Sequence, residues 1–179
     1  MRILILYSTV DGHTQKICER ISDLLVIKNI VEVIDVNNAD QINLTRYDFI
    51  IVGASIRYGK YRRNLIQFIN KNIIFLERSK TAFFSVNIVA RKDEKNSITT
   101  NPYIKIFHKA TNWNPDIISV FAGKLEYPKY NFFNKLIIRF IMWITNGPTN
   151  PSSIIEFTNW DKVKKFASDI DNFKEKNNK

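Results

Sequence analysis

The chain has 179 residues, of which 45% are hydrophobic and 13% aromatic, so it has enough apolar mass for one sizeable core. Five glycines and five prolines exclude collagen-like and Gly/Pro-rich disordered proteins, and the one cysteine, Cys18, excludes a disulfide framework. Lys and Arg number 27 against 17 Asp and Glu, and this net charge of +10 favours an anionic partner unless it reflects ordinary solubility. Since the only histidines are His13 and His108, we predict no metal site. No apolar stretch reaches about 18 residues, so we expect no transmembrane helix.

The first half of the chain alternates between short apolar runs and helical spacing. Residues 2–7, 31–36 and 48–54 are apolar runs that predict three strands. Between the first two, residues 13–28 carry apolar side chains at helical spacing. After the third, a second apolar face predicts a helix over about 60–74.

The second half repeats this alternation. Further strands are predicted at 81–89, 117–122 and 154–157. Asn101-Pro102 opens the helix that follows the fourth strand, since proline is well placed in the first turn. The last helix is expected to begin near Thr158, with Asp161 as its capping partner.

Strands that alternate with helices of this length predict an α/β fold with a doubly wound parallel sheet. Five strands in the order 2-1-3-4-5 are the commonest arrangement at this size. We expect one domain over residues 1–174, followed by a polar tail at 175–179. An insertion at 123–152 is expected to interrupt the last strand, whose two parts are 117–122 and 154–157. In such sheets the ligand lies beyond the carboxyl ends of the strands, which here means the loops after residues 7, 54 and 89.

A hydroxyl-rich loop joins the first predicted strand to the first predicted helix. It consists of Ser8, Thr9, Val10, Asp11, Gly12, His13 and Thr14. Such a loop at a helix N-terminus presents backbone N–H groups to a phosphate, although a plain capped turn would use the same residue types. With one glycine and no lysine in place, it is neither a Walker P-loop nor a GxGxxG dinucleotide fingerprint.

This loop and three further segments carry a family resemblance. Gly12-His13-Thr14 resembles the end of the loop with which flavodoxins bind the FMN phosphate, although flavodoxins usually have threonine where this chain has Asp11. The other segments are GASIRYG at 53–59, SVNIVARK at 85–92, and AG at 122–123 with YPKY at 127–130. Together they resemble the menaquinone-dependent protoporphyrinogen IX dehydrogenases, FMN enzymes on a long-chain flavodoxin scaffold that also have aspartate in the first loop.

The resemblance implies a flavodoxin-like fold, with the cofactor FMN held by the first loop and two others. The second loop consists of Ser55, Ile56, Arg57, Tyr58 and Gly59, and the third of Phe84, Ser85, Val86, Asn87, Ile88 and Val89. Tyr58 would stack on the flavin ring, or it is a half-buried surface aromatic. Asn87 either bonds the pyrimidine side of the ring or caps a turn at the end of its strand.

Basic residues follow the third and fourth predicted strands, at the edge expected to hold FMN. If the resemblance holds, Arg57, Arg62, Arg91 and Lys92 receive the two propionates of the porphyrinogen, since arginine forks suit carboxylates. The alternative is that these residues are solvent-exposed charges near the start of a helix and bind no substrate. Asp11 would repel a phosphate unless its side chain turns away, for example to cap the helix.

The resemblance implies that the chain oxidises protoporphyrinogen IX to protoporphyrin IX in three two-electron steps. The electrons would pass to a quinone, menaquinone or ubiquinone, and no residue is assigned as a catalytic acid or base. An electron-carrier flavodoxin without its own substrate chemistry is the alternative, but such carriers are usually acidic. A basic nucleic-acid-binding domain is a further alternative, but the flavin-type loops account for many of the charges, so we expect no nucleic-acid partner.

The insertion contains NFFNKLIIRFIMWIT at 131–145, which predicts a helix. A helix this apolar needs a protein groove or a membrane surface. We expect Phe132, Phe133, Phe140 and Trp143 to contact a membrane, with nearby basic residues suited to anionic headgroups. The protein would then be cytoplasmic and peripherally bound to the cytoplasmic face of the inner membrane. The helix would also cover the flavin and bring the site close to the porphyrinogen and to a quinone dissolved in the lipid. The alternative is an additional core or dimer helix.

Overall fold

The computed structural model describes residues 1–173, so the predicted tail at 175–179 lies outside the described residues. Its centre is a five-stranded parallel sheet with the order β2-β1-β3-β4-β5. The strands are β1 (Arg2–Ser8), β2 (Ile30–Asp35), β3 (Phe49–Ser55), β4 (Lys80–Asn87) and β5 (Ile117–Ala122). The predicted fold class and strand order are confirmed.

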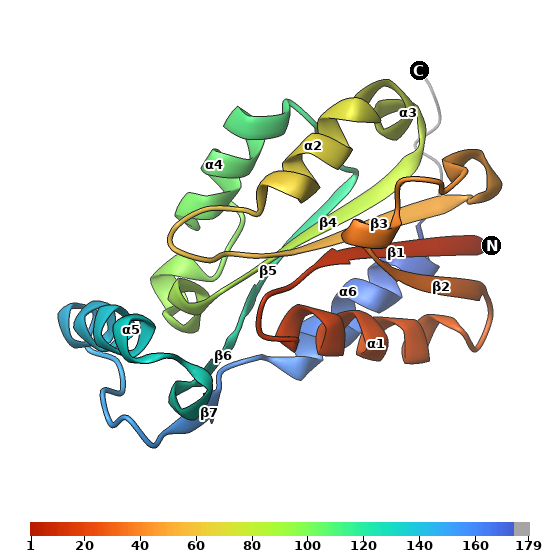
Figure 1. Cartoon of the computed structure of the whole chain (residues 1–179). Helices are drawn as coiled ribbons and strands as arrows, with labels where there is room; N and C mark the ends of the chain where they lie inside the picture. Colours follow the sequence, from red (N-terminus) through yellow and green to blue (C-terminus); the bar gives the residue numbers. More distant parts are fainter. Residues whose placement is uncertain (174–179) are drawn as a thin grey trace.

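Helices cover both faces of this sheet (Figure 1). On one face lie α2 (Arg63–Lys71), α3 (Ile73–Arg78) and α4 (Pro102–Thr111), and on the other α1 (His13–Leu25) and α6 (Trp160–Asp171). In α1 the side chains of Ile17, Ile21 and Leu25 recur every four residues and are buried against the sheet. The α4 N-terminus is as predicted, because Asn101 Oδ1 accepts a hydrogen bond from the Tyr103 N–H.

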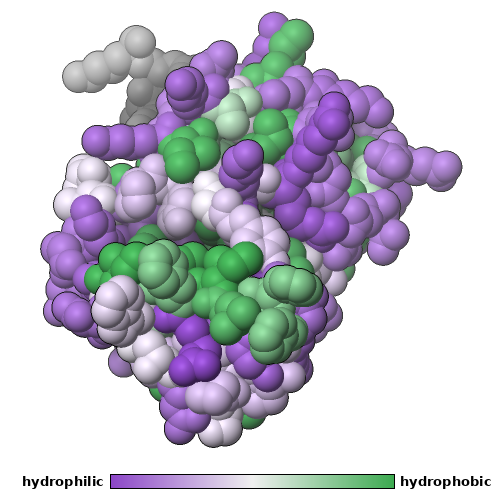
Figure 2. Space-filling view, turned by 60° about the vertical axis from the view of Figure 1, so that its left-hand side comes forward, coloured by the Kyte–Doolittle hydropathy of each residue, from purple (hydrophilic) through white to green (hydrophobic). Residues whose placement is uncertain are grey.

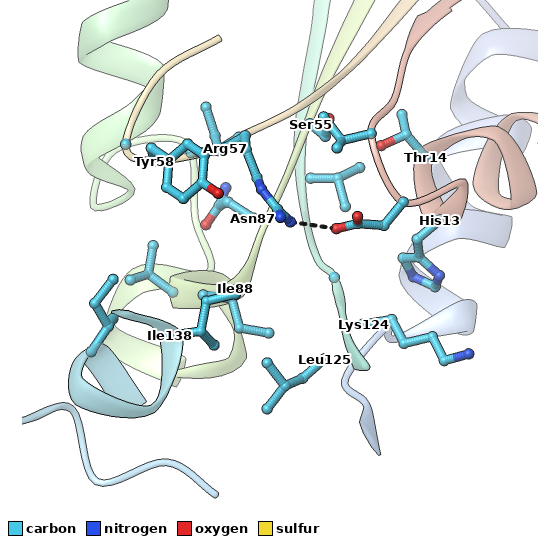
Figure 3. Close-up of a pocket in the computed structure, with 18 of the residues that line it drawn as sticks. His13, Thr14, Ser55, Arg57, Tyr58, Asn87, Ile88, Lys124, Leu125 and Ile138 are labelled. Carbon is cyan, nitrogen blue, oxygen red and sulfur yellow. Dashed lines mark hydrogen bonds and ion pairs between the residues drawn. The ribbon is translucent and has the colours of Figure 1, made fainter. Parts of the chain in front are cut away.

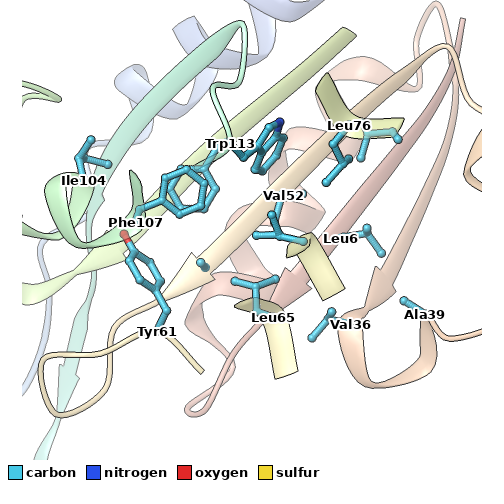
Figure 4. Close-up of a cluster of buried hydrophobic side chains, with 14 of the residues drawn as sticks. Leu6, Val36, Ala39, Val52, Tyr61, Leu65, Leu76, Ile104, Phe107 and Trp113 are labelled. Carbon is cyan, nitrogen blue, oxygen red and sulfur yellow. The ribbon is translucent and has the colours of Figure 1, made fainter. Parts of the chain in front are cut away.

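A separate apolar core lies on each face of the sheet, and β4 contributes to both. Successive side chains of a strand point to opposite faces. Phe83 stacks on Phe107 of α4, with 3.8 Å between ring centroids, whereas Phe84 packs against Phe166 of α6. Figure 4 shows Phe107 beside Trp113 in the first of these cores. Because both faces of the sheet are covered by helices, every residue of β4 from Thr81 to Asn87 is buried.

The helix predicted over about 60–74 is divided in two. Residues 57–60 form a tight hairpin, so α2 begins at Arg63, and Asn72 separates α2 from α3. The Asn72 side chain donates to the Phe68 carbonyl at 2.8 Å, and its backbone leaves the helical region at φ −108° and ψ 13°. Asparagine competes with the helix for backbone hydrogen bonds in this way. The helical spacing of apolar residues continues from α2 into α3, so the sequence pattern did not reveal the break at Asn72.

The last helix also begins later than predicted. α6 starts at Trp160, and its cap is Asn159, whose Oδ1 accepts from the Lys162 N–H at 3.0 Å. Asp161 instead pairs with Lys164. The expectation that Thr158 and Asp161 cap this helix was therefore wrong by one residue.

The segment after β5 forms a small unit of its own. β6 (Lys124–Glu126) pairs antiparallel with β7 (Ile154–Glu156), so the strand predicted at 154–157 does not extend the parallel sheet. Between them lies α5 (Phe132–Ile144), which confirms the predicted helix and is capped by the Asn131 side chain. Figure 1 shows α5 beyond the carboxyl ends of the sheet strands. Among residues 1–173, no helix is long and apolar enough to cross a membrane.

Candidate functional site

A pocket of about 480 Å³ lies at the carboxyl ends of β1, β3 and β4 and under α5 (Figure 3). Parallel α/β sheets bind their ligands at this edge. Most of the predicted cofactor residues line it: Thr9, Val10, Asp11, His13, Thr14, Ser55, Ile56, Arg57, Tyr58, Gly59, Val86, Asn87, Ile88 and Val89. The fold thus brings together three loops that are far apart in the sequence.

The loop after β1 makes one end of the pocket suited to a phosphate. Ser8 Oγ and Thr14 Oγ1 are buried and have no hydrogen-bond partner within residues 1–173. Buried hydroxyls normally have a partner, so these two fit an oxyanion ligand. Gly12, at φ 81°, precedes α1 and brings no side chain to cap its first N–H groups. The residues present fit the phosphate of FMN.

The loop after β3 is a two-residue hairpin turn. Arg57 and Lys60 exchange both backbone hydrogen bonds, at 3.0 and 3.1 Å. Tyr58 and Gly59 have φ angles of 49° and 75°, the positive pair of a type I′ turn. Tyrosine rarely adopts such an angle, so the neighbours of Tyr58 must stabilise it. Tyr58 lines the pocket and is 57% exposed, and its hydroxyl donates to Asn134 Oδ1 of α5.

Asp11 and Arg57 form an ion pair between the first two loops. Asp11 Oδ2 lies 2.7 Å from Arg57 Nη1, the contact drawn as a dashed line in Figure 3. The guanidinium also lies 5.1 Å from the ring centroid of Tyr58 and 5.2 Å from that of Tyr130. Asp11 does turn away, but toward Arg57 and not to cap α1. Pairing with a cation offsets the repulsion between this carboxylate and a phosphate.

Four predicted cofactor residues do not line the pocket: Ser8, Gly12, Phe84 and Ser85. Ser8 and Gly12 still shape its phosphate end, as described above. Phe84 belongs to the core under α6, and Ser85 Oγ accepts from the Tyr61 hydroxyl at 3.1 Å. Both residues lie within β4 and not in the loop that follows it. Their side chains are therefore buried between the sheet and the helices that cover it.

Asn87 lines the pocket, but its side chain is committed to the protein. Its Oδ1 accepts from the Ala90 N–H and from Asn101 Nδ2, both at 3.1 Å. Its Nδ2 donates to Ser85 Oγ at 3.2 Å. The side chain therefore caps the turn after β4, the second of the two interpretations that the sequence left open.

The four residues predicted to bind propionate differ in their contacts and in whether they line the pocket. Arg62 donates to the Thr9 carbonyl at 2.8 Å and so supports the phosphate loop. Lys92 lies 4.0 Å from Glu94, outside the pocket. Of the four, Arg57 is the one that lines the pocket.

Arg91 joins the loop after β4 to the end of α5. Its guanidinium donates to the carbonyl and hydroxyl oxygens of Thr145, at 3.0 and 2.8 Å, and to the Ile88 carbonyl at 3.1 Å. Burial lowers the pKa of Arg91. These partners satisfy the guanidinium within the protein, so its observed role is to hold two segments together.

Residues of the insertion complete the pocket, which agrees with the expectation that its helix covers this site, although the sequence did not say which of its residues face the pocket. They include Leu125, Tyr130, Ile137, Ile138, Ile141 and Met142. Ile138 and Met142 are four residues apart, so helical spacing places them on one face of α5. That spacing is the one signal that could have found them, and it does not say what the face covers.

His13 and Cys18, the remaining candidates near this loop, have structural partners. His13 Nε2 lies 2.6 Å from Thr158 Oγ1, and Thr158 donates to the Ala122 carbonyl, so the ring is the donor in the first contact. Burial lowers the pKa of His13. Cys18 is fully buried, which raises the pKa of its thiol and disfavours the reactive thiolate.

Solved flavodoxin structures share this fold. The flavodoxin of Streptococcus pneumoniae TIGR4 superposes with a TM-score of 0.51 over 94% of this chain and 96% of that chain, at 14% identity. The two-electron reduced flavodoxin of Megasphaera elsdenii gives a TM-score of 0.52 over 66% of this chain and 84% of that chain, at 12% identity. At such identities the likeness concerns the fold alone.

Sequence relatives extend along almost the whole chain. The flavodoxin domain family matches residues 4–152. A protein of Leishmania major named protoporphyrinogen IX dehydrogenase (quinone) is 41% identical over 94% of this chain and 74% of its own length. A protein of Escherichia coli K12 with the same name is 37% identical over 95% of this chain and 94% of its own length. Fold, pocket and sequence agree, and the chain belongs to the flavodoxin family, among the relatives named quinone-dependent protoporphyrinogen IX dehydrogenases.

Proposed function

We propose that this chain oxidises protoporphyrinogen IX to protoporphyrin IX, with FMN as its cofactor and a quinone as the electron acceptor. The observation that carries the proposal is the near full-length identity of 37–41% to proteins named for this reaction. The flavodoxin domain and the two unpartnered hydroxyls at the phosphate end support FMN as the cofactor.

The pocket residues have separate roles in this reaction. Bound FMN supplies the two-electron acceptor that the porphyrinogen reduces and the quinone reoxidises. Ser8, Thr14 and the N-terminus of α1 bind the phosphate. Arg57 binds a propionate in place of Asp11, since its fork suits a carboxylate. α5 covers the apolar end of the pocket and keeps water from it.

The test measures porphyrin fluorescence from the purified protein under anaerobic conditions, with porphyrinogen and a soluble quinone. We expect fluorescence to rise when FMN and quinone are both present, and a flavin absorption band from the protein itself. A flavin band without porphyrin formation would identify an electron carrier and overturn the proposal.

A variant tests the part assigned to Arg57. Arg57→Ala should raise KM for the porphyrinogen while the FMN content of the protein stays the same. Arg63→Ala is the matched control, because Arg63 is an exposed arginine at the start of α2 outside the pocket. Equal kcat/KM for Arg57→Ala and the unmodified protein would remove the propionate role.

The outer face of α5 supports a membrane-bound location for this reaction. Phe132, Phe133, Phe140 and Trp143 are 61–73% exposed, and Figure 2 shows apolar surface gathered on the side of the molecule that carries α5. The basic residues Lys129, Lys135 and Arg139 lie in or beside the same helix. We propose that this face docks on an anionic membrane, because a bare apolar face of this kind is rare on soluble surfaces and the adjacent charges suit anionic headgroups.

Flotation with anionic vesicles tests the docking. The triple replacement of Phe132, Phe140 and Trp143 by serine should abolish flotation. A control triple replacement of Ile27, Ile30 and Ile74, which are equally exposed but lie outside α5, should float like the unmodified protein. Loss of a dimer in the α5 variant, with no vesicle binding by either protein, would favour the dimer-helix alternative.

A further inference from the structure

The pocket is divided by chemistry into two halves. Thr9, Asp11, His13 and Thr14 line the end next to α1, where the phosphate is expected. The other half lies under α5 and is lined by Ile88, Leu125, Ile138 and Met142. Figure 3 shows Ile88, Leu125 and Ile138 around the same space, away from Thr14. The phosphate does not account for this second half, and a flavin ring stacked on Tyr58 would lie next to it.

The apolar half has a well-packed wall. Met142 is fully buried in a cluster with Leu125, Tyr127 and Tyr130, against which Ile88 and Ile138 pack. The turn after α5 fits closely under it, since a Cβ at Gly147 would lie 2.6 Å from Met142 Cε. The insertion therefore has a small core of its own, and its apolar face toward the pocket is part of that core.

Both ends of α5 are tied to the loops of the pocket. At its start, Asn134 accepts a hydrogen bond from the Tyr58 hydroxyl in the loop after β3. At its end, Thr145 accepts two hydrogen bonds from Arg91 in the loop after β4. These contacts fix the distance between α5 and the two loops, so the apolar half is a preformed space.

This half offers no unpaired positive charge. Within residues 1–173, the lysine and arginine side chains that line the pocket are Lys124 and Arg57. Lys124 lies 3.2 Å from Glu126, and Arg57 lies 2.7 Å from Asp11. Arg57 can exchange Asp11 for a propionate at the edge of this half, but a carboxylate placed deeper under α5 would meet only apolar side chains. Burying that charge without a partner is costly, whereas an uncharged ring needs no partner there.

The apolar half opens toward the outer face of α5. Ile137 and Ile141 line the pocket and are still 46% and 41% exposed. They lie in the same helix as the exposed Phe140 and Trp143, and Figure 2 shows apolar surface gathered on the side of the molecule that carries α5. A molecule dissolved in the lipid could enter the pocket past Ile137 and Ile141 without crossing water.

We propose that the apolar half of the pocket is the quinone-binding site, with the quinone ring packed against the wall formed by Ile88, Leu125, Ile138 and Met142. The isoprenoid chain leaves past Ile137 and Ile141 into the membrane. The proposal rests on the proposed function, which supplies a quinone as the acceptor, and it gives the insertion a role in substrate choice.

Binding calorimetry of the FMN-loaded protein with 2-methyl-1,4-naphthoquinone, without vesicles and without porphyrinogen, tests the site. Ile138→Glu places a carboxylate in the apolar half and should raise the quinone Kd at least about tenfold, because the ring would displace its hydration. FMN content should stay the same. Ile144→Glu is the control, since Ile144 is on α5, is 59% exposed and does not line the pocket. Its quinone Kd should match that of the unmodified protein.

A second variant, Ile141→Glu, covers the case in which Ile138→Glu does not fold, because Ile141 is at the exposed edge of the same opening. An unchanged quinone Kd in the folded variants would overturn the site. A parallel loss of FMN would also overturn it, by assigning the apolar half to the cofactor. If the unmodified protein formed porphyrin with quinone while both variants kept its KM for quinone, the site would fail and the proposed function would stand. If the unmodified protein formed no porphyrin, the function itself would fail.

Discussion

β1 and α5 are similarly apolar in sequence and differ almost completely in burial. Ile3, Leu4, Ile5 and Leu6 of β1 are fully buried between the two helical layers. In α5, one of thirteen residues, Met142, is buried, and bulky side chains such as Phe133 and Trp143 are about two-thirds exposed or more. Apolar residues in the sheet stabilise the fold, whereas those on the outer face of α5 contribute little to it and indicate a binding surface.

The largest expected difference between the two regions is in stability. Phe83→Ala should lower the free energy of unfolding by about 3–5 kcal/mol, because Phe83 is fully buried against Phe107 and Trp113. Phe140→Ala should change it by less than about 0.5 kcal/mol, since this side chain is 61% exposed. Urea unfolding of both variants measures the contrast. A cost for Phe140→Ala close to that of Phe83→Ala would mean that α5 is a core helix and would break the comparison.

A second prediction separates the regions by ligand. Gly12→Val should weaken FMN binding by roughly 10-fold or more, because a β-branched residue at φ 81° costs about 1–3 kcal/mol and distorts the phosphate loop. Flavin-fluorescence titration measures the affinity, and circular dichroism checks the fold. Vesicle flotation of this variant should be unchanged. The serine triple variant of α5 should instead lose flotation and keep its FMN affinity. Normal FMN affinity in folded Gly12→Val would remove the phosphate role from this loop.

A third prediction concerns the connection between the two regions. Thr145→Val removes the hydroxyl that accepts from Arg91 and leaves the Thr145 carbonyl in place. The same hydroxyl donates to the Ile141 carbonyl at 2.7 Å, so the variant loses two hydrogen bonds. Their loss should cost about 1–3 kcal/mol, seen as easier local opening of α5 and not as global unfolding. Hydrogen exchange should show faster exchange in α5 and unchanged protection in β1 and β4. Thr149→Val is the control. Thr149 is a half-buried threonine of the same segment, and the hydrogen bonds described for Arg91 do not include it. Equal exchange in all three proteins would show that Arg91 does not hold α5.

The smallest effect expected is a pH dependence of stability that arises at His13, where α1 contacts Thr158 after the insertion. Burial lowers the pKa of His13 below its ordinary value of 6.5, so the unfolded chain binds the proton more readily than the folded one. Stability should therefore fall as the pH drops through 6.5 and level off below the folded-state pKa. His13→Gln keeps a donor toward Thr158 and should weaken this dependence in thermal unfolding scans. An identical pH profile for both proteins would show that His13 does not contribute to it.

Much of the fold could be predicted because its signals are local. The strand runs, the α4 cap at Asn101 and the apolar pattern of α5 each depend on neighbouring residues, and these elements lie within two residues of their predicted bounds. Boundaries failed where a polar side chain formed a hydrogen bond that spacing does not reveal, as with Asn72 between α2 and α3 and Asn159 at the start of α6.

The loops that meet at the pocket also followed from the sequence, because the carboxyl ends of parallel strands must lie at one edge. The tertiary structure decided which side chains at that edge are free. Arg62 and Arg91 carry the charge that the sequence assigned to substrate, but backbone carbonyls from distant segments occupy them. The partner of Asp11, the burial of Asn87 and the inner face of α5 were decided in the same way, since each depends on contacts between residues far apart in the chain. Local composition determines which residues can bind a ligand, and long-range packing determines which of them still have that capacity.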